Sequence, residues 1–458
     1  MPPTHRRGSP LSSWHDMHSS LEPLLEKLRP VHVGLVIAIS TCVCILATYH
    51  AFRPKDKPDA SISTLCRSCS SNMTASKVVY LNNANTILDY SVGARGEDFE
   101  FDDCKHVAQT IYPGFRDANA DDIVIKIICG GITNRLYRLT WQDKSVLLRI
   151  YGEHTEVFID RDIDNETFAE LSRRGFAPMY HGRFRNGRIE GWVDGVPLEP
   201  HQMGDPKLLP LIATEVGKMH AMDMKFPTTP CLWKKIHVFE ELASLVRFDD
   251  PLKQKALASL RLKQIQQRVQ WAQTILPSAQ NGHGKQLLET FRGSPIAKLA
   301  TAFLQESVFS HNDMLSGNVL YNPSWSKVQV IDYEYGGYNY RGYDFANHFC
   351  EHCGLDMNLN AYPSQPKQVQ FYKAYLAAAS PALLHSLTQD HHLDEFVAAL
   401  HDAGNLYALA SHLFWGLWAV VQASNSTIEF DFLEYARVRL EAFDVHADMF
   451  GAKPQSVE

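Results

Sequence analysis

The order of apolar patterns along the chain constrains its fold more than any other feature. Residues 123–192 contain short apolar, β-branched runs with one helical segment between them. Helical spacing dominates from Pro206 onward, and a short strand pair at 318–331 interrupts it. Strands grouped ahead of helices predict an α+β protein with a small β-rich N-terminal lobe and a larger helical C-terminal lobe. The chemistry is then expected in the cleft between the lobes.

The expected elements follow from these patterns. Strands are predicted at 123–128, 136–139, 145–150, 188–193, 318–321 and 327–331. Helices are predicted at 160–173, 208–222, 238–246, 257–276 and 397–421. The polar segment 281–294 is predicted to be a loop between helices.

The domain boundaries are expected near residues 98, 195 and 450. The predicted small lobe covers 98–194 and the helical lobe 195–449, followed by a tail at 450–458. Residues 1–30 are rich in Ser, Pro and His, which predicts disorder, and 53–97 are predicted to be a linker.

A nearly uncharged stretch at 31–52 is a candidate transmembrane helix. At ~1.5 Å per residue it can cross a hydrocarbon core of ~30 Å, although several polar residues interrupt it. The alternatives are a buried helix or an unrelated first exon joined to the gene. Arg53, Lys55 and Lys57 follow the stretch, which predicts a cytoplasmic catalytic domain anchored to an internal membrane.

Composition excludes some partners and leaves others open. The net charge of −7 provides no global positive field, so nucleic acid is not an expected partner. The nine cysteines include two C-x-x-C pairs, Cys66 with Cys69 and Cys350 with Cys353. Neither has a second Cys or His pair at zinc-site spacing, so structural zinc is not expected. The sequence leaves open whether the chain forms a homodimer.

The most informative stretch for chemistry is 310–318, SHNDMLSGN. Phosphoryl transfer needs a carboxylate at the attacking oxygen and oxygen ligands that hold Mg²⁺ on the phosphates. Asp313 followed five residues later by Asn318 could supply both, and Asp332 at the end of the next strand could be a second metal ligand. Alone, the first pattern is usually an ordinary loop and the second a helix cap. Their order and spacing together are typical of kinase-like phosphotransferases.

The run 331–351, IDYEYGGYNYRGYDFANHFCE, closely resembles the signature of the choline/ethanolamine kinase family. The resemblance covers about residues 125–443 and leaves out the first hundred. It implies a two-lobed protein-kinase-like fold, with ATP and Mg²⁺ as cofactors and a small amino alcohol as substrate. Tyr and Glu follow Asp332 where protein kinases have Phe and Gly, so a protein kinase is not expected.

The resemblance also implies roles for individual residues. Asp313 corresponds to the catalytic base, within a motif that includes His311, and Asn318 and Asp332 correspond to magnesium ligands. The nucleotide side would include the turn residues Gly130, Gly131, Thr133 and Asn134, the strand residue Arg149, and Glu190 and Gly191 where adenine would lie. The substrate side would include Glu334 and Glu351 and a cationic-head pocket of Tyr335, Trp415, Trp418 and Tyr435.

Each of these assignments has a structural alternative. Gly130-Gly131 alone marks a hairpin turn, and the charge of Arg149 in an apolar strand requires a partner whatever its role. Glu334 could instead form a salt bridge with Arg341. Aromatic residues at helical spacing, such as the two tryptophans, are usually part of a core.

Ethanolamine is the favoured amino alcohol. A choline head has no N–H and needs a full aromatic cage, whereas a primary ammonium has three donors. The residues after Glu351 lack the aromatic cluster that choline kinases tend to carry, and 160–162 and 426–432 look more like ethanolamine kinases. The alternatives are a choline or dual-specificity kinase, an aminoglycoside-type phosphotransferase, and a membrane-anchored pseudokinase that only binds.

Overall fold

The structure, a computed structural model, describes residues 87–128, 134–152, 155, 159–277, 294–426 and 428–451. All of these residues belong to one compact unit, Asp59–Glu458. The predicted disordered segment 1–30 and the candidate transmembrane helix 31–52 lie outside the described residues, as does nearly all of the predicted loop 281–294.

The small lobe is built on a six-stranded sheet with the order β1-β5-β6-β4-β3-β2. Its strands are β1 (Ile87–Leu88), β2 (Val124–Ile128), β3 (Asn134–Trp141), β4 (Lys144–Tyr151), β5 (Tyr180–Phe184) and β6 (Gly187–Gly191). Neighbouring strands are antiparallel except β1, which runs parallel to β5. The four strands predicted in this region are confirmed, with shifts of a few residues at their ends.

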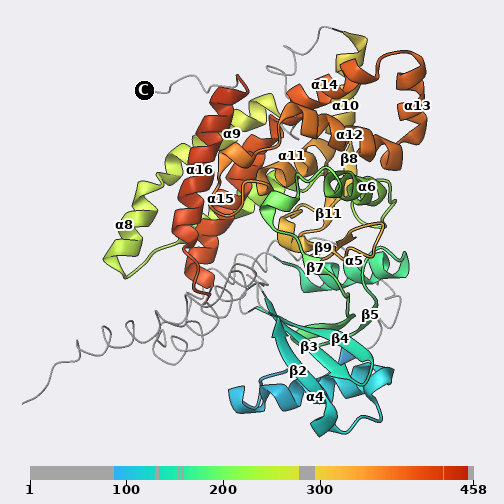
Figure 1. Cartoon of the computed structure of the whole chain (residues 1–458). Coiled ribbons are helices and arrows are strands. Elements are labelled where there is room, and N and C mark those ends of the chain that lie inside the picture. Colours follow the sequence, from blue (N-terminus) through green and yellow to red (C-terminus); the bar gives the residue numbers. More distant parts are fainter. Residues whose placement is uncertain are drawn as a thin grey trace, which may run out of the picture. The chain divides into compact units, whose positions relative to one another are not determined.

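Two helices pack on this sheet (Figure 1). Helix α4 (Glu100–Ile111) buries Val107 and Ile111 in one core with the sheet residues Leu139 and Leu148. Helix α5 (Arg161–Arg173) is the predicted one, and the side chain of Asp160 caps its first turn.

The folded part begins earlier than predicted. Ile87 pairs with Arg183 in the sheet, and Val92 is buried in the core of the small lobe. Residues 87–97 therefore belong to this lobe and not to the predicted linker. Their pairing partners lie about a hundred residues further along the chain, so no local sequence pattern predicts that residues 87–97 are folded.

The larger lobe is mainly helical. Its α-helices are α6 (Leu208–His220), α7 (Leu232–Leu245), α8 (Pro251–Ser259), α9 (Leu262–Ile275), α10 (Pro295–Gln305), α11 (Arg341–Glu351), α12 (Gln365–Ala379), α13 (Pro381–Gln389), α14 (Leu393–Gly404), α15 (Tyr407–Asn425) and α16 (Phe432–Met449). Helix α15 lies at the centre of this lobe and packs against α7, α9, α11 and α16.

Two predicted helices are wrong in their continuity. The predicted helix 257–276 is divided into α8 and α9, because Arg261 adopts a left-handed backbone with φ of 52°. The predicted helix 397–421 is divided into α14 and α15 beside Asn405. The Asn405 side chain accepts hydrogen bonds from Tyr362 and Gln368, so long-range contacts stabilise that break.

The segment Leu393–Asn425 is apolar and long enough to cross a membrane, but 94% of its most apolar window is buried inside the protein. In the described part of the chain it therefore serves as the core of the helical lobe.

Short strands beside the helices position the candidate site. Strand β8 (Ser307–Ser310) pairs with β11 (Gly337–Tyr340), and β9 (Val319–Tyr321) lies between β7 (Val196–Pro197) and β10 (Gln329–Val330). The predicted strand pair is thus confirmed as β9 and β10. Between β8 and β9 lies the loop with Asp313, and Asp332 follows β10.

Candidate active site

Asp313 lies in the loop that links β8 to the 3₁₀ helix η6 (Ser316–Asn318). The preceding residue, Asn312, has a left-handed backbone with φ of 66°, a conformation that must be held by its surroundings. Its side-chain amide donates to the backbone oxygen of Tyr335 at 3.0 Å and accepts from Asn339 at 2.8 Å. These bonds fix the loop against β11.

His311 holds the loop from the other side. Its Nε2 donates to the backbone oxygen of Ile331 at 2.9 Å, and its Nδ1 accepts from the backbone N–H of Asp313 at 3.2 Å. Burial lowers the pKa of this imidazole, which fits the neutral form that these two bonds require. Both ring nitrogens are engaged with backbone, which favours a positioning role for His311, and its expected part in catalysis stays a prediction.

Asp344 is an important residue that the sequence analysis did not single out. Its carboxylate accepts from the backbone N–H groups of His311 at 3.2 Å and Asn312 at 2.7 Å. The imidazole of His220 lies 2.9 Å from the same carboxylate. Burial alone would raise the pKa of Asp344, but these partners lower it, so the carboxylate stays charged and anchors the loop.

Asn318 and Asp332 are brought next to Asp313 by backbone pairing. The Asn318 side chain donates to the backbone oxygen of Asp313 at 2.9 Å and to its carboxylate at 3.1 Å. The backbone oxygen of Asn318 accepts a hydrogen bond from the backbone N–H of Ile331 at 3.0 Å. Asp332 comes directly after Ile331 and has a left-handed backbone with φ of 63°. The two acids and the carboxamide therefore lie in one cluster.

Arg149 connects the small lobe to this cluster. Its guanidinium lies 3.0 Å from Glu190 and 3.0 Å from Asp332 of the helical lobe. Glu190 also pairs with the fully buried Arg188 at 2.7 Å, and Arg188 pairs with Asp164 at 2.8 Å. The predicted need of Arg149 for a partner is confirmed. The Glu190 side chain is buried in this ion network, so its carboxylate is not directed to an adenine ring.

Glu334 is held by residues of the small lobe. Its carboxylate accepts from Arg161 at 3.0 Å and from the side-chain amide of Asn134 at 3.2 Å. The alternative salt bridge to Arg341 is wrong, because that guanidinium contacts Glu306, Phe303 and Tyr375 instead.

The cluster carries an excess of negative charge. Among the described residues, six carboxyl groups (Asp164, Glu190, Asp313, Asp332, Glu334 and Glu351) face four guanidinium groups (Arg149, Arg161, Arg188 and Arg439), a surplus of two negative charges when all six are ionised. Burial, followed by the charges of Glu351 and Asp332, raises the pKa of Asp313 well above its usual value. Burial raises the pKa of Asp332 to about 6, although Arg149 lowers it. Such a site favours bound cations.

Aromatic side chains form the neighbouring wall. The indole N–H of Trp418 donates to the Tyr335 hydroxyl at 2.8 Å, and that of Trp415 donates to Asn347 at 2.8 Å. The Trp415 ring is 5.3 Å from both the Tyr335 ring and the Trp418 ring, centre to centre. Three of the four predicted aromatic residues are thus brought together, and each indole has a polar partner that fixes its orientation.

Tyr435 and Glu351 meet through Arg439. The Glu351 carboxylate accepts from the fully buried Arg439 at 2.8 Å, and this guanidinium also lies over the Tyr435 ring at 5.4 Å. Besides burial, the charge of Glu351 raises the pKa of Asp313, and the charge of Asp313 raises the pKa of Tyr435. Glu351 and Tyr435 therefore lie close enough to Asp313 to interact with it electrostatically.

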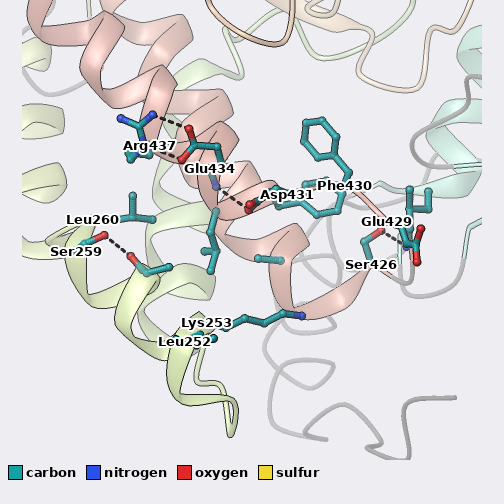
Figure 2. Close-up of a pocket in the computed structure, with 15 residues that line it drawn as sticks. Leu252, Lys253, Ser259, Leu260, Ser426, Glu429, Phe430, Asp431, Glu434 and Arg437 are labelled. Atoms are coloured by element: carbon teal, nitrogen blue, oxygen red, sulfur yellow. Dashed lines mark hydrogen bonds and ion pairs between the residues drawn. The ribbon is translucent and has the colours of Figure 1, made fainter. Parts of the chain in front are cut away.

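A hollow of about 530 Å³ lies elsewhere, between α8 and the start of α16. Figure 2 shows its lining, with Lys253 on one side and Phe430, Asp431 and Glu434 on the other. None of the predicted site residues lines it. The Asp431 side chain caps α16 there.

The structure thus describes most of the predicted site. Gly130, Gly131 and Thr133 lie outside the described residues, and Gly191 ends β6 with its N–H bonded to the Met179 carbonyl. The sequence analysis missed Arg161, Arg188, Asp344 and Arg439. Asp344 lies within the signature run 331–351, and Arg161 lies within 160–162. Both stretches resemble the family, but the resemblance does not indicate what these two residues do.

Comparison with known proteins agrees with this geometry. The family model "Choline/ethanolamine kinase" matches residues 125–444. "Probable ethanolamine kinase" of Arabidopsis thaliana is 34% identical over 70% of this chain and 80% of its own. "Ethanolamine kinase 1" of Homo sapiens is 34% identical over 76% of this chain and 73% of its own.

Solved structures support the fold. A choline kinase from Cryptosporidium parvum matches with a TM-score of 0.60 and 25% identity, over 76% of this chain and 95% of its own. An ethanolamine kinase from Plasmodium vivax matches with a TM-score of 0.61 and 22% identity, over 86% of this chain and 95% of its own. With these relatives and the clustered acids, the chain belongs to the choline/ethanolamine kinase family.

Proposed function

We propose that the chain transfers the γ-phosphoryl group of ATP to the hydroxyl of ethanolamine, the first step of the CDP-ethanolamine route to phosphatidylethanolamine. The observation that carries this proposal is the Asp313 carboxylate, which lies between the ion cluster of Asp332 and Arg149 and the aromatic wall of Tyr335 and Trp418. Burial and the charges of Glu351 and Asp332 raise the pKa of Asp313, so its ionised carboxylate is a stronger proton acceptor for an alcohol than an ordinary aspartate.

In the proposed reaction, Asp313 accepts the proton of the substrate hydroxyl. The hydroxyl oxygen forms a bond to the γ-phosphorus, and the bond from that phosphorus to the bridging oxygen of ADP breaks. Arg149, which is already directed to Asp332, is suited to contact the phosphates. The turn of Gly130, Gly131 and Thr133 is proposed to cover the triphosphate, with Asn134 and residues 190–191 completing the nucleotide side.

Asn318 and Asp332 are the proposed Mg²⁺ ligands. The side-chain nitrogen of Asn318 is used by Asp313, which leaves the side-chain oxygen Oδ1 for a metal, and Arg149 contacts one oxygen of Asp332. Hard oxygen donors in a cluster with surplus negative charge fit Mg²⁺. When bound, the ion would neutralise charge that develops on the phosphates.

Three features support ethanolamine as the amino alcohol. The two curated relatives described above carry ethanolamine kinase as their name. Segment 160–162, which favoured ethanolamine in the sequence, supplies the Arg161 that holds Glu334. Segment 426–432 supplies Phe430 and Phe432, whose rings pack against Tyr435 and Trp418 at 5.7 and 5.8 Å.

Choline is the alternative substrate, because the same aromatic rings can attract a quaternary ammonium. Steady-state kinetics with MgATP on ethanolamine, choline and their N-methylated intermediates separates the two. We expect kcat/KM to fall with each added methyl group, since each one removes an N–H donor. A higher kcat/KM for choline than for ethanolamine would refute the proposed preference.

The membrane anchor at 31–52 and a homodimer remain proposals, as does a cytoplasmic location of the catalytic lobes. Cell fractionation with protease protection tests the first and last. We expect the full-length chain in the membrane fraction with its lobes open to protease on the cytoplasmic side, and a wholly soluble chain rules the anchor out. Light scattering on the purified chain tests the homodimer.

A further inference from the structure

Three metal-binding side chains meet where α11, α15 and α16 pack together. Cys350, His412 and His446 are buried, and one ligand atom of each lies within 4.8 Å of the other two. Cys350 Sγ lies 3.9 Å from His412 Nε2, which lies 3.0 Å from His446 Nδ1. We propose that these three side chains bind a structural zinc ion, because thiolate and imidazole are the ligands zinc prefers.

The spacing of the three atoms suits zinc. Tetrahedral zinc has Zn–S bonds of ~2.3 Å and Zn–N bonds of ~2.0–2.1 Å, which places sulfur and nitrogen ligands roughly 3.5 Å apart and two nitrogens roughly 3.3 Å apart. The Cys350–His412 and His412–His446 separations differ from these values by a few tenths of an ångström, and Cys350 and His446 lie within 4.8 Å of each other. Side-chain shifts that draw the three ligand atoms around one point would admit the ion.

The charge around the cluster also matters for a cation. Zinc binds cysteine as the thiolate, so the ion would displace the Cys350 thiol proton to solvent on binding. The nearby Arg439 guanidinium is neutralised by Glu351 at 2.8 Å and does not oppose the ion with a full charge.

The outer nitrogens of the two imidazoles have no support. His412 Nδ1 and His446 Nε2, the ring atoms that do not share the hydrogen bond between the two histidines, find no hydrogen-bond partner among the described residues. The same lack of outer partners removes the support that usually strengthens a histidine ligand, typically ~10–100-fold in affinity. We therefore expect a site that a strong chelator can empty.

The site would connect the helices that carry the substrate pocket. Cys350 precedes Glu351 on α11, His412 lies one turn before Trp415 on α15, and α16 carries His446 with Tyr435. A zinc ion here would fix the three helices relative to one another. Local spacing predicts no zinc at Cys350, because no second Cys or His pair follows it at zinc-site spacing, and the two histidines come from other helices.

The test is to measure the metal content of the full chain by inductively coupled plasma mass spectrometry. The chain is purified without a polyhistidine tag and without a chelator. We expect about one zinc per chain. Cys350→Ser and His446→Asn should reduce it at least ~10-fold. The matched controls Cys353→Ser, a buried cysteine on the next turn, and His401→Asn, a histidine of α14, should keep it.

A second measurement needs no variant and stands even if Cys350→Ser fails to fold. Cobalt added to the chelator-treated chain should give the intense near-ultraviolet band of thiolate-to-cobalt charge transfer, and zinc should remove it. The chelated chain, assayed with excess Mg²⁺, should show a KM for its amino alcohol raised several-fold with kcat nearly unchanged. A purified chain that lacks zinc and gives no cobalt–thiolate band would overturn the proposal.

Discussion

The two walls of the candidate active site are built differently. The proposed nucleotide wall depends on charged groups that come from both lobes, as in the contacts of Arg149 with Glu190 of the small lobe and with Asp332 of the helical lobe. The substrate wall depends on aromatic rings and on the Glu351–Arg439 pair, all from the helical lobe. The first wall therefore requires the lobes to keep their relative position, whereas the second is preorganised by packing within one lobe.

Asp313 stands between the walls, and its loss should have the largest effect. Asp313→Asn keeps the shape of the side chain but removes the proton acceptor, so kcat should fall ~10²–10⁴-fold. Binding of ATP should change little, because Arg149 and Asp332 are untouched. Steady-state kinetics and nucleotide titration measure the two effects, with the exposed Asp249→Asn as control. Equal activity of Asp313→Asn and the unchanged chain would remove Asp313 from its role.

Exchanging one arginine in each wall tests whether the walls are separate. Arg149→Met leaves Glu190 and Asp332 without their shared guanidinium, and Arg439→Met leaves Glu351 without its own. Arg439→Met strands the buried Glu351 carboxylate and should lower the free energy of unfolding by ~3–5 kcal/mol, measured by urea titration. Arg149→Met should lower it by less, because Glu190 keeps its pair with Arg188 and the Asp332 side chain is partly exposed. The exposed Arg437→Met should cost less than ~1 kcal/mol.

The kinetic effects of these two variants should differ in kind. Arg149→Met should raise KM for ATP, and Arg439→Met should raise KM for the amino alcohol. The assays are run at low temperature, where both variants stay folded, so that a change in KM does not reflect loss of folded protein. If both variants raise the same KM, the division into two walls is incorrect.

The candidate active site also shows which residues could be predicted from the sequence. Asp313, Asn318 and Asp332 were found because they lie within twenty residues on one loop and one hairpin, where local spacing fixes their proximity. Their partners could not be found in that way. Arg161 reaches Glu334, and Arg439 reaches Glu351, only after the helices have packed. The break of the predicted helix at Arg261 could not be predicted from local sequence either, because no Gly or Pro lies at that position.

A smaller effect is expected within the substrate wall. Trp418→Phe keeps an aromatic ring but removes the N–H that donates to the Tyr335 hydroxyl. A lost hydrogen bond of this kind costs ~0.5–1.5 kcal/mol, which corresponds to an increase of ~2–10-fold in KM for the amino alcohol. Tyr335→Phe removes the acceptor of the same bond, so the double variant should be little worse than either single one. Trp271→Phe, on α9, is the matched control and should leave KM unchanged.

The last effect concerns the support behind the Asp313 loop, the His220–Asp344 pair, and appears only in acid. Burial lowers the pKa of His220, against the opposing influence of Asp344, so the folded chain resists taking up the proton that the unfolded chain accepts below about pH 6.5. Stability should therefore fall as the pH decreases from that value, by up to ~1.4 kcal/mol per pH unit for this one group. His220→Gln lacks a titrating group, so its stability curve should run parallel to the original above pH 6.5 and be flatter below it. Urea titrations of both chains between pH 7.5 and 5 measure the difference, and curves that stay parallel throughout would mean that His220 is not held neutral in the fold.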